Sequence, residues 1–326
     1  MKRVFTGIQP TGVPHIGHYF GVISQLISMQ YNNIRPIVMI ADLHSLTSGV
    51  FKDHDYDIRR RSRLLTAALL ASGVDPLKTT IYRQSDISAH SELFWILCNF
   101  VNISKVASVP TYQDVKQNDS VSMGRFAYAV LQAADILLLR ATDIPIGKDQ
   151  IPHIELCRDI AAKFNKRCST DVFKIPTPII DDEYCCCLKS LRDPSKKMSK
   201  SDPDRNSCVF LSDTNLEIER KVRLALTDSL PNITFDLKQR PALHNLLTIE
   251  KMLTGKSQED LHYESIQQLK QSLTMNLTNL IEPIRTRIES YDSRYLEGVL
   301  LSGRAFVSKL VTETMSTVRR ALGYEL

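Results

Sequence analysis

The chain has 326 residues, 43% of them hydrophobic, and this size and composition allow two domains with substantial cores. The longest apolar stretch, around residues 130–139, is interrupted by Gln132 and Asp135 and is shorter than the roughly 20 residues that a membrane-spanning helix needs. The formal net charge of +5 lies in residues 1–205, because residues 206–326 carry equal numbers of basic and acidic side chains, and the seven cysteines contain no CxxC pair that would favour a zinc or iron–sulfur site. We therefore expect neither a membrane nor a protein-bound metal as a partner.

The first predicted element is a strand that begins at Arg3, so no signal peptide or organellar presequence is visible ahead of it. It leads through a turn-rich segment to Pro14, which suits the first turn of a helix. A helix start offers unpaired N–H groups and a positive dipole end to an anion, and His15 and His18 would add donors from one face. Gly17 would let a flat base or ribose approach the backbone. A phosphate site and a pair of satisfied histidines both fit these residues.

The next segments alternate between strand and helix patterns. An apolar run at 34–47 predicts a strand buried on both faces, 54–76 a helix that ends near Gly73, 78–87 another strand, and 91–101 another helix with Trp95 in the core. This order implies parallel βαβ units, so we predict an α/β fold with a doubly wound parallel, Rossmann-like sheet. Ligands of such sheets bind beyond the carboxyl ends of the strands.

After residue 205 the pattern becomes helical. The segments 213–227, 241–255, 264–291 and 302–323 show apolar residues at helical spacing, with Asp213 as a candidate cap of the first and Gly255 as the end of the second. We therefore predict a Rossmann-like catalytic domain at 1–205 and an appended all-α domain at 206–326.

Between these parts lies a lysine-rich loop at 193–204, in which Lys197 and Lys200 alternate with serines. Such a loop can hold a triphosphate and neutralise the charge that develops on a leaving pyrophosphate. An exposed basic loop without a ligand is the alternative.

Two short motifs carry a family resemblance. Residues 15–18 read His-Ile-Gly-His and residues 197–201 read Lys-Met-Ser-Lys-Ser, and both resemble the signatures of class I aminoacyl-tRNA synthetases. The segments 7–21, 41–47, 133–138, 147–156 and 190–203 resemble the tryptophanyl-tRNA synthetases of the bacterial and mitochondrial type. The similarity is dense through residue 205 and weaker in the helical tail.

The resemblance implies a tryptophan–tRNA ligase. Such an enzyme activates L-tryptophan with ATP to tryptophanyl-adenylate and pyrophosphate, and then transfers tryptophan to the 3′ end of tRNA(Trp). It further implies that the helical domain binds the anticodon arm, that the protein is a homodimer without a DNA partner, and that Mg²⁺ is held through the phosphates of ATP. Residue usage leans toward the mitochondrial matrix, and the bacterial cytoplasm is the alternative.

The resemblance also assigns site residues. The chemistry would rest on His15, His18, Lys197 and Lys200. The ATP site would comprise Gln9, Pro10, Thr11, Gly17, His18, Lys116, Gly147, Lys148, Asp149, Leu188, Lys197, Met198, Ser199, Lys200 and Ser201.

The resemblance implies that specificity lies in residues 128–138, where the i, i+4 and i+7 spacing places Tyr128, Gln132 and Asp135 on one helix face. The resemblance implies that Asp135 accepts the indole N–H, which would reject phenylalanine, although the carboxylate could instead pair elsewhere. The whole tryptophan site would comprise Phe5, His44, Tyr128, Gln132, Asp135, Ile144, Ile146 and Gln150.

Two positions depart from the family pattern. Gln132 stands where many bacterial members have methionine, and a glutamine before the aspartate also resembles tyrosyl-tRNA synthetases, so tyrosine activation is an alternative. Lys148 stands where an acidic residue is common. A small-molecule nucleotidyltransferase and a catalytically silent tRNA-binding relative are further alternatives. For the remaining histidines we predict structural or surface roles, with His153 supporting the pocket from behind: His90, His153, His244 and His262.

Overall fold

The computed structural model describes residues 2–32, 34–48, 57–110, 122–180, 188–200, 202–230 and 232–325. Its main sheet is parallel, with the strand order β1 (Phe5–Ile8), β2 (Ile37–Ile40) and β3 (Thr80–Arg83). A second parallel pair, β4 (Asp143–Pro145) and β5 (Thr177–Ile179), adjoins β1 through a bridge between Val4 and Asp143. The predicted parallel α/β sheet is therefore confirmed.

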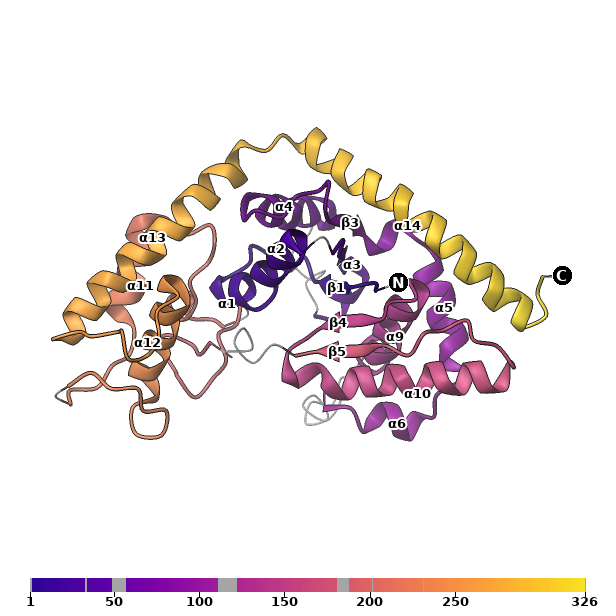
Figure 1. The fold of residues 1–326 in the computed structure, drawn as a ribbon, viewed down its shortest axis with the longest axis horizontal. Coiled ribbons are helices and arrows are strands. Elements are labelled where there is room, and N and C mark those ends of the chain that lie inside the picture. The colour runs from indigo at the N-terminus through magenta and orange to yellow at the C-terminus, as the bar shows by residue number, and fades with distance from the viewer. Residues whose placement is uncertain are drawn as a thin grey trace.

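Helices cover both faces of the sheet, and the three helices described between residues 215 and 290 form a helical lobe beside it (Figure 1). Three short helical segments sit close to the strand ends: the 3₁₀ turn Gln84–Asp86 after β3, the 3₁₀ turn Lys148–Gln150 after β4, and the π-helical turn Tyr19–Ile23 after α1. The helices are α1 (Ile16–His18), α2 (Ser24–Tyr31), α3 (Asp42–Ser45), α4 (Ile58–Ala71), α5 (Ala89–Cys98), α6 (Ile103–Ala107), α8 (Met123–Phe126), α9 (Tyr128–Leu138), α10 (Ile151–Arg167), α11 (Asn215–Leu224), α12 (Pro241–Thr254), α13 (Ile266–Ser290) and α14 (Ser293–Ala321).

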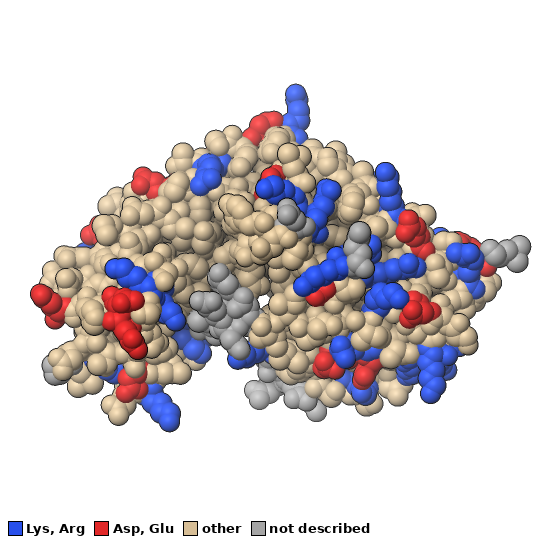
Figure 2. All heavy atoms as spheres, in the orientation of Figure 1, with Lys and Arg blue, Asp and Glu red and all other residues tan. Residues whose placement is uncertain are grey.

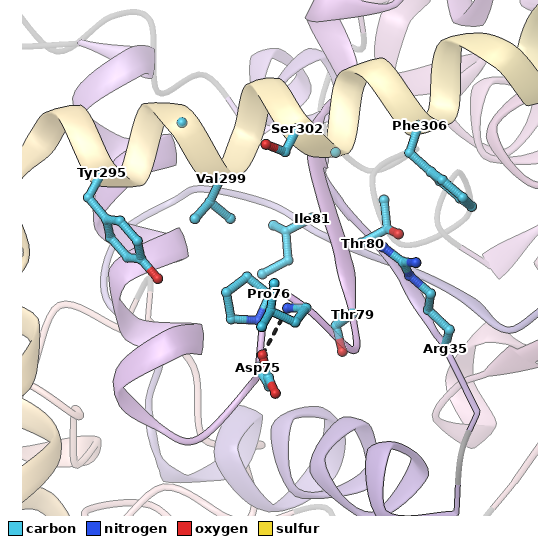
Figure 3. Close-up of a pocket in the computed structure, with 13 residues that line it drawn as sticks. Arg35, Asp75, Pro76, Thr79, Thr80, Ile81, Tyr295, Val299, Ser302 and Phe306 are labelled. Carbon is cyan, nitrogen blue, oxygen red and sulfur yellow. Dashed lines mark hydrogen bonds between the residues drawn. The ribbon is translucent and has the colours of Figure 1, made fainter.

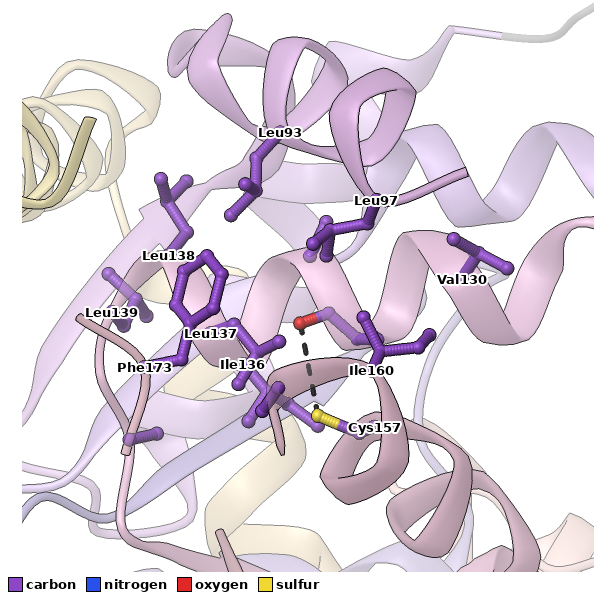
Figure 4. Close-up of a cluster of buried hydrophobic side chains, with 14 of the residues drawn as sticks. Leu93, Leu97, Val130, Ile136, Leu137, Leu138, Leu139, Cys157, Ile160 and Phe173 are labelled. Carbon is purple, nitrogen blue, oxygen red and sulfur yellow. Dashed lines mark hydrogen bonds between the residues drawn. The ribbon is translucent and has the colours of Figure 1, made fainter. Parts of the chain in front are cut away.

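Alternate strand residues divide the interior into two cores. Met39 and Tyr82 face one core, which they share with α5, α9, α10 and the second half of α14, whereas Val38 and Ile81 face the other, which includes α4 and the helical lobe. Figure 4 shows α9 between α5 and α10 in the first core, where the Cys157 thiol points at a carbonyl of α9. This packing fixes α9, which carries the predicted specificity residues.

Two local predictions were wrong. Trp95 is 72% exposed, because α5 packs on α9 with its opposite face and leaves the indole in solvent. Asp213 does not cap α11: Thr214 does, in a capping box with Glu217, while Asp213 binds the ammonium of Lys221 at 2.6 Å. Gly255 does end α12, with a left-handed φ of +67°.

The last helix, α14, leaves the helical lobe and runs across the sheet (Figure 1). It contacts β3 very closely at Gly303, where a Cβ atom would lie 1.9 Å from the carbonyl oxygen of Ile81. The predicted domain division after residue 205 stays a prediction, and the final element of the predicted helical part packs on the catalytic sheet. Within the described ranges, no helix has the length and apolar character needed to cross a membrane.

Candidate active site

A cavity of about 390 Å³ opens at the carboxyl ends of β1 and β2, where the topology predicts a ligand. Its walls come from β1, α1, α3, α9 and the segment after β4. A larger cavity of about 560 Å³ lies under α14 at the opposite, amino-terminal end of β3 (Figure 3). Of the described residues that line the larger cavity, none is a predicted site residue. The smaller cavity is therefore the candidate site.

The fold brings together residues that are far apart in the sequence. All the predicted tryptophan-site residues line the smaller cavity: Phe5, His44, Tyr128, Gln132, Asp135, Ile144, Ile146 and Gln150. The predicted ATP-site residues that line it are Gln9, Thr11, His18, Gly147 and Lys200.

The other predicted ATP-site residues lie outside this lining. Lys197 and Asp149 face each other at the rim, with 3.9 Å between the ammonium and a carboxylate oxygen. Leu188 and Met198 are buried in the second core, and the Met198 N–H donates to the Leu188 carbonyl at 2.8 Å. This bond anchors the middle of the lysine loop to the segment that precedes it. The remaining members of this group are Pro10, Gly17, Lys148 and Ser199, while Lys116 and Ser201 fall outside the described residues.

The His15–His18 segment forms a compact helix start. His15 is the N-cap of α1, and its Nδ1 accepts a hydrogen bond from the Gly17 N–H at 3.0 Å. Pro14 therefore precedes the cap and does not occupy the first helical turn. A Cβ atom on Gly17 would lie 2.7 Å from the His15 ring, so the glycine makes room for this ring. The rings of His15 and His18 meet edge to face, with 4.0 Å between their centroids.

Both histidines are neutral at physiological pH. Burial, together with the nearby lysines, lowers the pKa of His15 to about 3, and burial with the neighbouring His15 lowers the pKa of His18 well below its usual value. Because Nδ1 of His15 accepts a hydrogen bond, its proton is on Nε2. The pair can therefore offer N–H donors to phosphate oxygens but no positive charge.

Positive charge at the cavity comes from Lys200. Its ammonium lies 3.5 Å from the carbonyl oxygen of Gly12, in the turn before α1. Gly12 has a φ of +128°, which other residues rarely adopt. Burial lowers the pKa of Lys200 to about 8, so the charged form is less favoured here than in water. An incoming anion would restore that charge.

The deepest polar group of the cavity is the carboxylate of Asp135, which is 1% exposed. One oxygen accepts from His90 Nδ1 at 2.7 Å and the other from His44 Nε2 at 2.7 Å. The side-chain amide of Gln84 donates to both oxygens, at 2.8 and 3.0 Å. The predicted site residues His44 and Asp135 thus belong to one hydrogen-bond cluster.

A second set of contacts orients the wall above Asp135. His153 Nδ1 and the side-chain oxygen of Gln132 are 2.6 Å apart, so His153 holds Gln132 from behind, as the sequence suggested. The Gln9 amide donates to the Tyr128 hydroxyl at 3.0 Å. Gln9 and Tyr128 come from the predicted nucleotide and amino-acid groups, respectively, and this bond joins the two.

Sequence reasoning missed Gln84 and His90 as parts of the site. Both follow the carboxyl end of β3, in the 3₁₀ turn and in α5, and this position was the signal that could have identified them. His90 was instead assigned a structural or surface role.

The sequence matches the family model described as "tRNA synthetases class I (W and Y)" over residues 1–280. A tryptophan–tRNA ligase of Prochlorococcus marinus is 39% identical over 99% of this chain and 97% of its own length. The mitochondrial tryptophan–tRNA ligase of Caenorhabditis elegans is 32% identical over 98% of this chain and 91% of its own length.

Solved structures agree with these relatives. The tryptophanyl-tRNA synthetase of Mycoplasma pneumoniae superposes with a TM-score of 0.88 at 29% identity, covering 99% of this chain and 98% of that one. That of Campylobacter jejuni in complex with ADP and tryptophan superposes with a TM-score of 0.82 at 29% identity, covering 98% of this chain and 99% of that one. The chain is thus a member of the class I tRNA synthetases of the tryptophan and tyrosine (W and Y) family.

Proposed function

We propose that this protein is a tryptophan–tRNA ligase. It activates L-tryptophan with ATP and transfers the aminoacyl group to the 3′ end of tRNA(Trp). The observation that carries the proposal is a fully buried, hydrogen-bonded carboxylate, Asp135, in a cavity that also holds His18 and Lys200. The relatives favour this proposal over the tyrosine alternative. They are tryptophan–tRNA ligases, and their similarity extends over nearly the whole chain.

The amino-acid end of the cavity fits a flat, apolar ring with one N–H donor. Phe5 of β1 and Ile144 of β4, both buried, form apolar walls. Asp135 then accepts the indole N–H at the bottom of the cavity. A ring without that donor would place no hydrogen-bond partner against the desolvated carboxylate, which is unfavourable. The remaining wall residues position the ring: His44, Tyr128, Gln132, Ile146 and Gln150.

The nucleotide end of the cavity fits the phosphates and ribose of ATP. The N–H groups of His15 and His18 would donate to phosphate oxygens, while Lys197 and Lys200 supply positive charge. Mg²⁺ would be bound by the phosphate oxygens and would add to this charge. Lys116 would reach the phosphates, Gly147, Lys148 and Asp149 would hold the ribose and adenine, and the backbone at Leu188 would lie near the base. The remaining contacts to the nucleotide would come from Gln9, Pro10, Thr11, Gly17, Met198, Ser199 and Ser201.

In the first step a carboxylate oxygen of tryptophan attacks the α-phosphorus of ATP. A new oxygen–phosphorus bond forms, the bond to the β-phosphate breaks, and pyrophosphate leaves with the electron pair. In the second step a ribose hydroxyl of the tRNA attacks the carbonyl carbon and AMP leaves. Because the protein supplies no covalent group, its contribution is positioning and stabilisation of charge by Lys197 and Lys200.

ATP–pyrophosphate exchange with each of the proteinogenic amino acids tests the proposed function. We expect exchange with tryptophan and at most trace exchange with tyrosine or phenylalanine. Exchange driven by tyrosine alone would replace the proposal with a tyrosine enzyme. Binding of tRNA(Trp) without exchange by any amino acid would instead indicate a catalytically silent relative.

We propose that residues 206–326 bind the anticodon arm of tRNA(Trp). Figure 2 shows Lys and Arg side chains gathered more densely over the half of the molecule that holds the sheet than over the helical lobe. Because residues 206–326 also carry equal numbers of basic and acidic side chains, we expect this part to read the anticodon mainly by shape and polar contacts, with a weak salt dependence. Binding of the isolated anticodon stem-loop at 50 and 200 mM salt tests this, because a protein that neutralises many phosphates would lose affinity steeply.

We also propose that the protein is a homodimer. Large apolar side chains are strongly exposed on three helices of the described chain: Trp95 on α5, Ile103 on α6 and Met123 on α8, at 72%, 77% and 76%. We infer that they contribute to one apolar patch, because a contiguous exposed patch is typical of a protein interface, whereas single exposed apolar side chains are common. Sedimentation velocity should give a dimer for the natural protein and a larger monomer fraction for Trp95→Asp. A monomer at micromolar concentration would overturn the proposal.

The compartment is proposed to be the mitochondrial matrix, with the bacterial cytoplasm as the alternative. The relatives include bacterial enzymes and one mitochondrial enzyme. Fractionation of the source cells followed by immunoblotting decides between the two.

A further inference from the structure

We propose that Gln84 and His90 are specificity-determining positioning residues, which hold the Asp135 carboxylate in the one orientation that reads the ring N–H of the substrate. The inference deepens the proposed function and rests on it. Neither residue is among the described residues that line the cavity, so they act through Asp135 and not on the substrate.

Three side chains donate hydrogen bonds to the carboxylate of Asp135. His44, Gln84 and His90 approach Asp135 from three different elements, α3, the turn after β3, and α5. Since Gln84 bridges both oxygens, the carboxylate plane cannot rotate without breaking at least one bond. A buried carboxylate with a single partner would have no such constraint.

Both positioning residues are themselves held by further hydrogen bonds. The side-chain oxygen of Gln84 accepts from the backbone N–H groups of Leu43 and His44, at 3.2 and 3.4 Å, so its amide cannot flip. His90 is fully buried, and its Nε2 lies 3.1 Å from the Tyr82 hydroxyl. Because His90 Nδ1 donates to Asp135, its Nε2 accepts the Tyr82 O–H, which selects one tautomer.

The surroundings of Asp135 favour the charged form of its carboxylate. Burial on its own raises the pKa of Asp135, but the His90 ring and the hydrogen bond from His44 outweigh it, and the pKa lies below its usual value. The group is therefore an ionised acceptor. It can pair with a ring N–H, and it has no proton to offer to a ring that lacks one.

The test compares two substrates in ATP–pyrophosphate exchange: tryptophan, and β-(3-benzothienyl)alanine, in which sulfur replaces the ring N–H. The readout is the ratio of the two kcat/KM values. For the natural protein we expect a ratio on the order of 10² or more, because the buried carboxylate loses its partner with the analogue. A ratio near one in the natural protein would mean that Asp135 does not read the N–H, and the proposed recognition would fail before any variant is considered.

The variants Gln84→Met and His90→Leu remove one donor each at similar side-chain volume. We expect the ratio to fall by about tenfold, through a loss of activity toward tryptophan with little change toward the analogue. His90→Asn places an amide donor near the position of Nδ1 and should restore the ratio to within about threefold. An equal loss with both substrates and an unchanged ratio would show a merely structural role and overturn the inference.

Two further variants test whether the change in the ratio is specific to the Asp135 cluster. Tyr82→Phe keeps the buried ring and removes only the hydroxyl that orients His90, so it should fold and lower the ratio by about two- to fivefold; an unchanged ratio would contradict the role of the orientation. His244→Leu changes a half-buried histidine in α12 that bonds to Thr248 and should leave the ratio unchanged. A similar fall in this control would make the effect nonspecific.

Discussion

The amino-acid end and the nucleotide end of the cavity hold their polar groups in different ways. At the amino-acid end the Asp135 carboxylate is buried and fixed by three side-chain donors at 2.7–3.0 Å. At the nucleotide end the Lys200 ammonium has one long contact, at 3.5 Å, and the Lys197 side chain is 60% exposed. At the amino-acid end the acceptor is held in one orientation before substrate binds, whereas at the nucleotide end the lysines would gain their contacts from the phosphates.

The difference follows from what each end must do. Discrimination between ring types needs a rigid acceptor, because a side chain that can turn away would tolerate a ring without the N–H. Stabilisation of a leaving pyrophosphate needs charge that follows the phosphates as they move, which suits lysines on a loop. The experiments below separate substrate selection from rate at these two ends.

The largest effect is expected for Asp135→Asn. The substitution keeps the side-chain shape but removes the charge and places an amide N–H₂ against donors, so His44, Gln84 or His90 loses its acceptor. We expect kcat/KM for tryptophan to fall on the order of 10³-fold. Steady-state exchange kinetics measure the fall, and the KM for ATP at saturating tryptophan should change by less than about threefold. An equal rise in both KM values would mean that the two ends are not separable.

The next effect is expected for Lys200→Ala. Loss of a charge that acts in the transition state should slow adenylate formation on the order of 10²-fold while leaving tryptophan binding nearly unchanged. Single-turnover kinetics measure the rate. Lys196→Ala is the matched control, because Lys196 is an exposed neighbour that pairs with Asp193 at 3.1 Å outside the cavity. A normal rate for Lys200→Ala would remove this lysine from the mechanism.

The pH dependence of kcat/KM for ATP is expected to report the titration of the Lys200 ammonium. Burial lowers the pKa of Lys200 to about 8, so its charge is present below that pH and is lost above it. The rate constant should therefore decline above about pH 8 by up to tenfold per pH unit. Because the pKa of His15 is about 3, titration of that histidine should cause no change in kcat/KM between pH 5 and 8.

Lys200→Arg provides the control for this profile, since a guanidinium stays charged throughout the range. The alkaline limb should disappear in this variant, even if the maximum rate is lower. A profile of the natural protein that stays flat to pH 9.5 would contradict the assignment to Lys200.

The sequence was sufficient for the scaffold and for many of the side chains that line the cavity, although it did not identify Thr6, Val22, Met39 or Ile136. Strand and helix alternation is a local pattern, and the histidine and lysine motifs are contiguous, so both can be read without a structure. The spacing of Tyr128, Gln132 and Asp135 likewise placed them on one face of α9.

The predictions that failed or missed depend on contacts between distant segments. Trp95 is in an apolar helix, and only the packing of α5 on α9 determines that its indole faces outward. His90 looked structural because its partner Asp135 is 45 positions away. A fully buried polar residue gives no periodic signal that distinguishes a positioning role from a purely structural one. The Lys116 and Ser201 assignments lie outside the described residues and stay predictions.

The smallest effect is expected where α14 supports the amino-acid end from outside. Gly303 touches the Ile81 backbone, and the α14 residue Glu297 pairs with Arg83, which directly precedes Gln84, at 3.0 Å. A methyl group in Gly303→Ala must displace β3 or α14, so we expect the free energy of unfolding to fall by about 1–3 kcal/mol. The displacement should raise the KM for tryptophan by about twofold or more and leave the KM for ATP unchanged.

Gly298→Ala, one and a half turns earlier on the same helix, is the matched control. Apart from its chain neighbours and the backbone of its own helix, no heavy atom of the described chain lies within 4 Å of a Cβ at this position. The free energy of unfolding of the variant should therefore rise by about 0.5–1 kcal/mol because alanine has the better helix propensity. Urea unfolding measures both variants. If Gly303→Ala raised the KM for ATP instead, the support from α14 would reach the nucleotide end. The rigidity of the amino-acid end would then need a source other than the contact between β3 and α14, although Gln84 directly follows that strand.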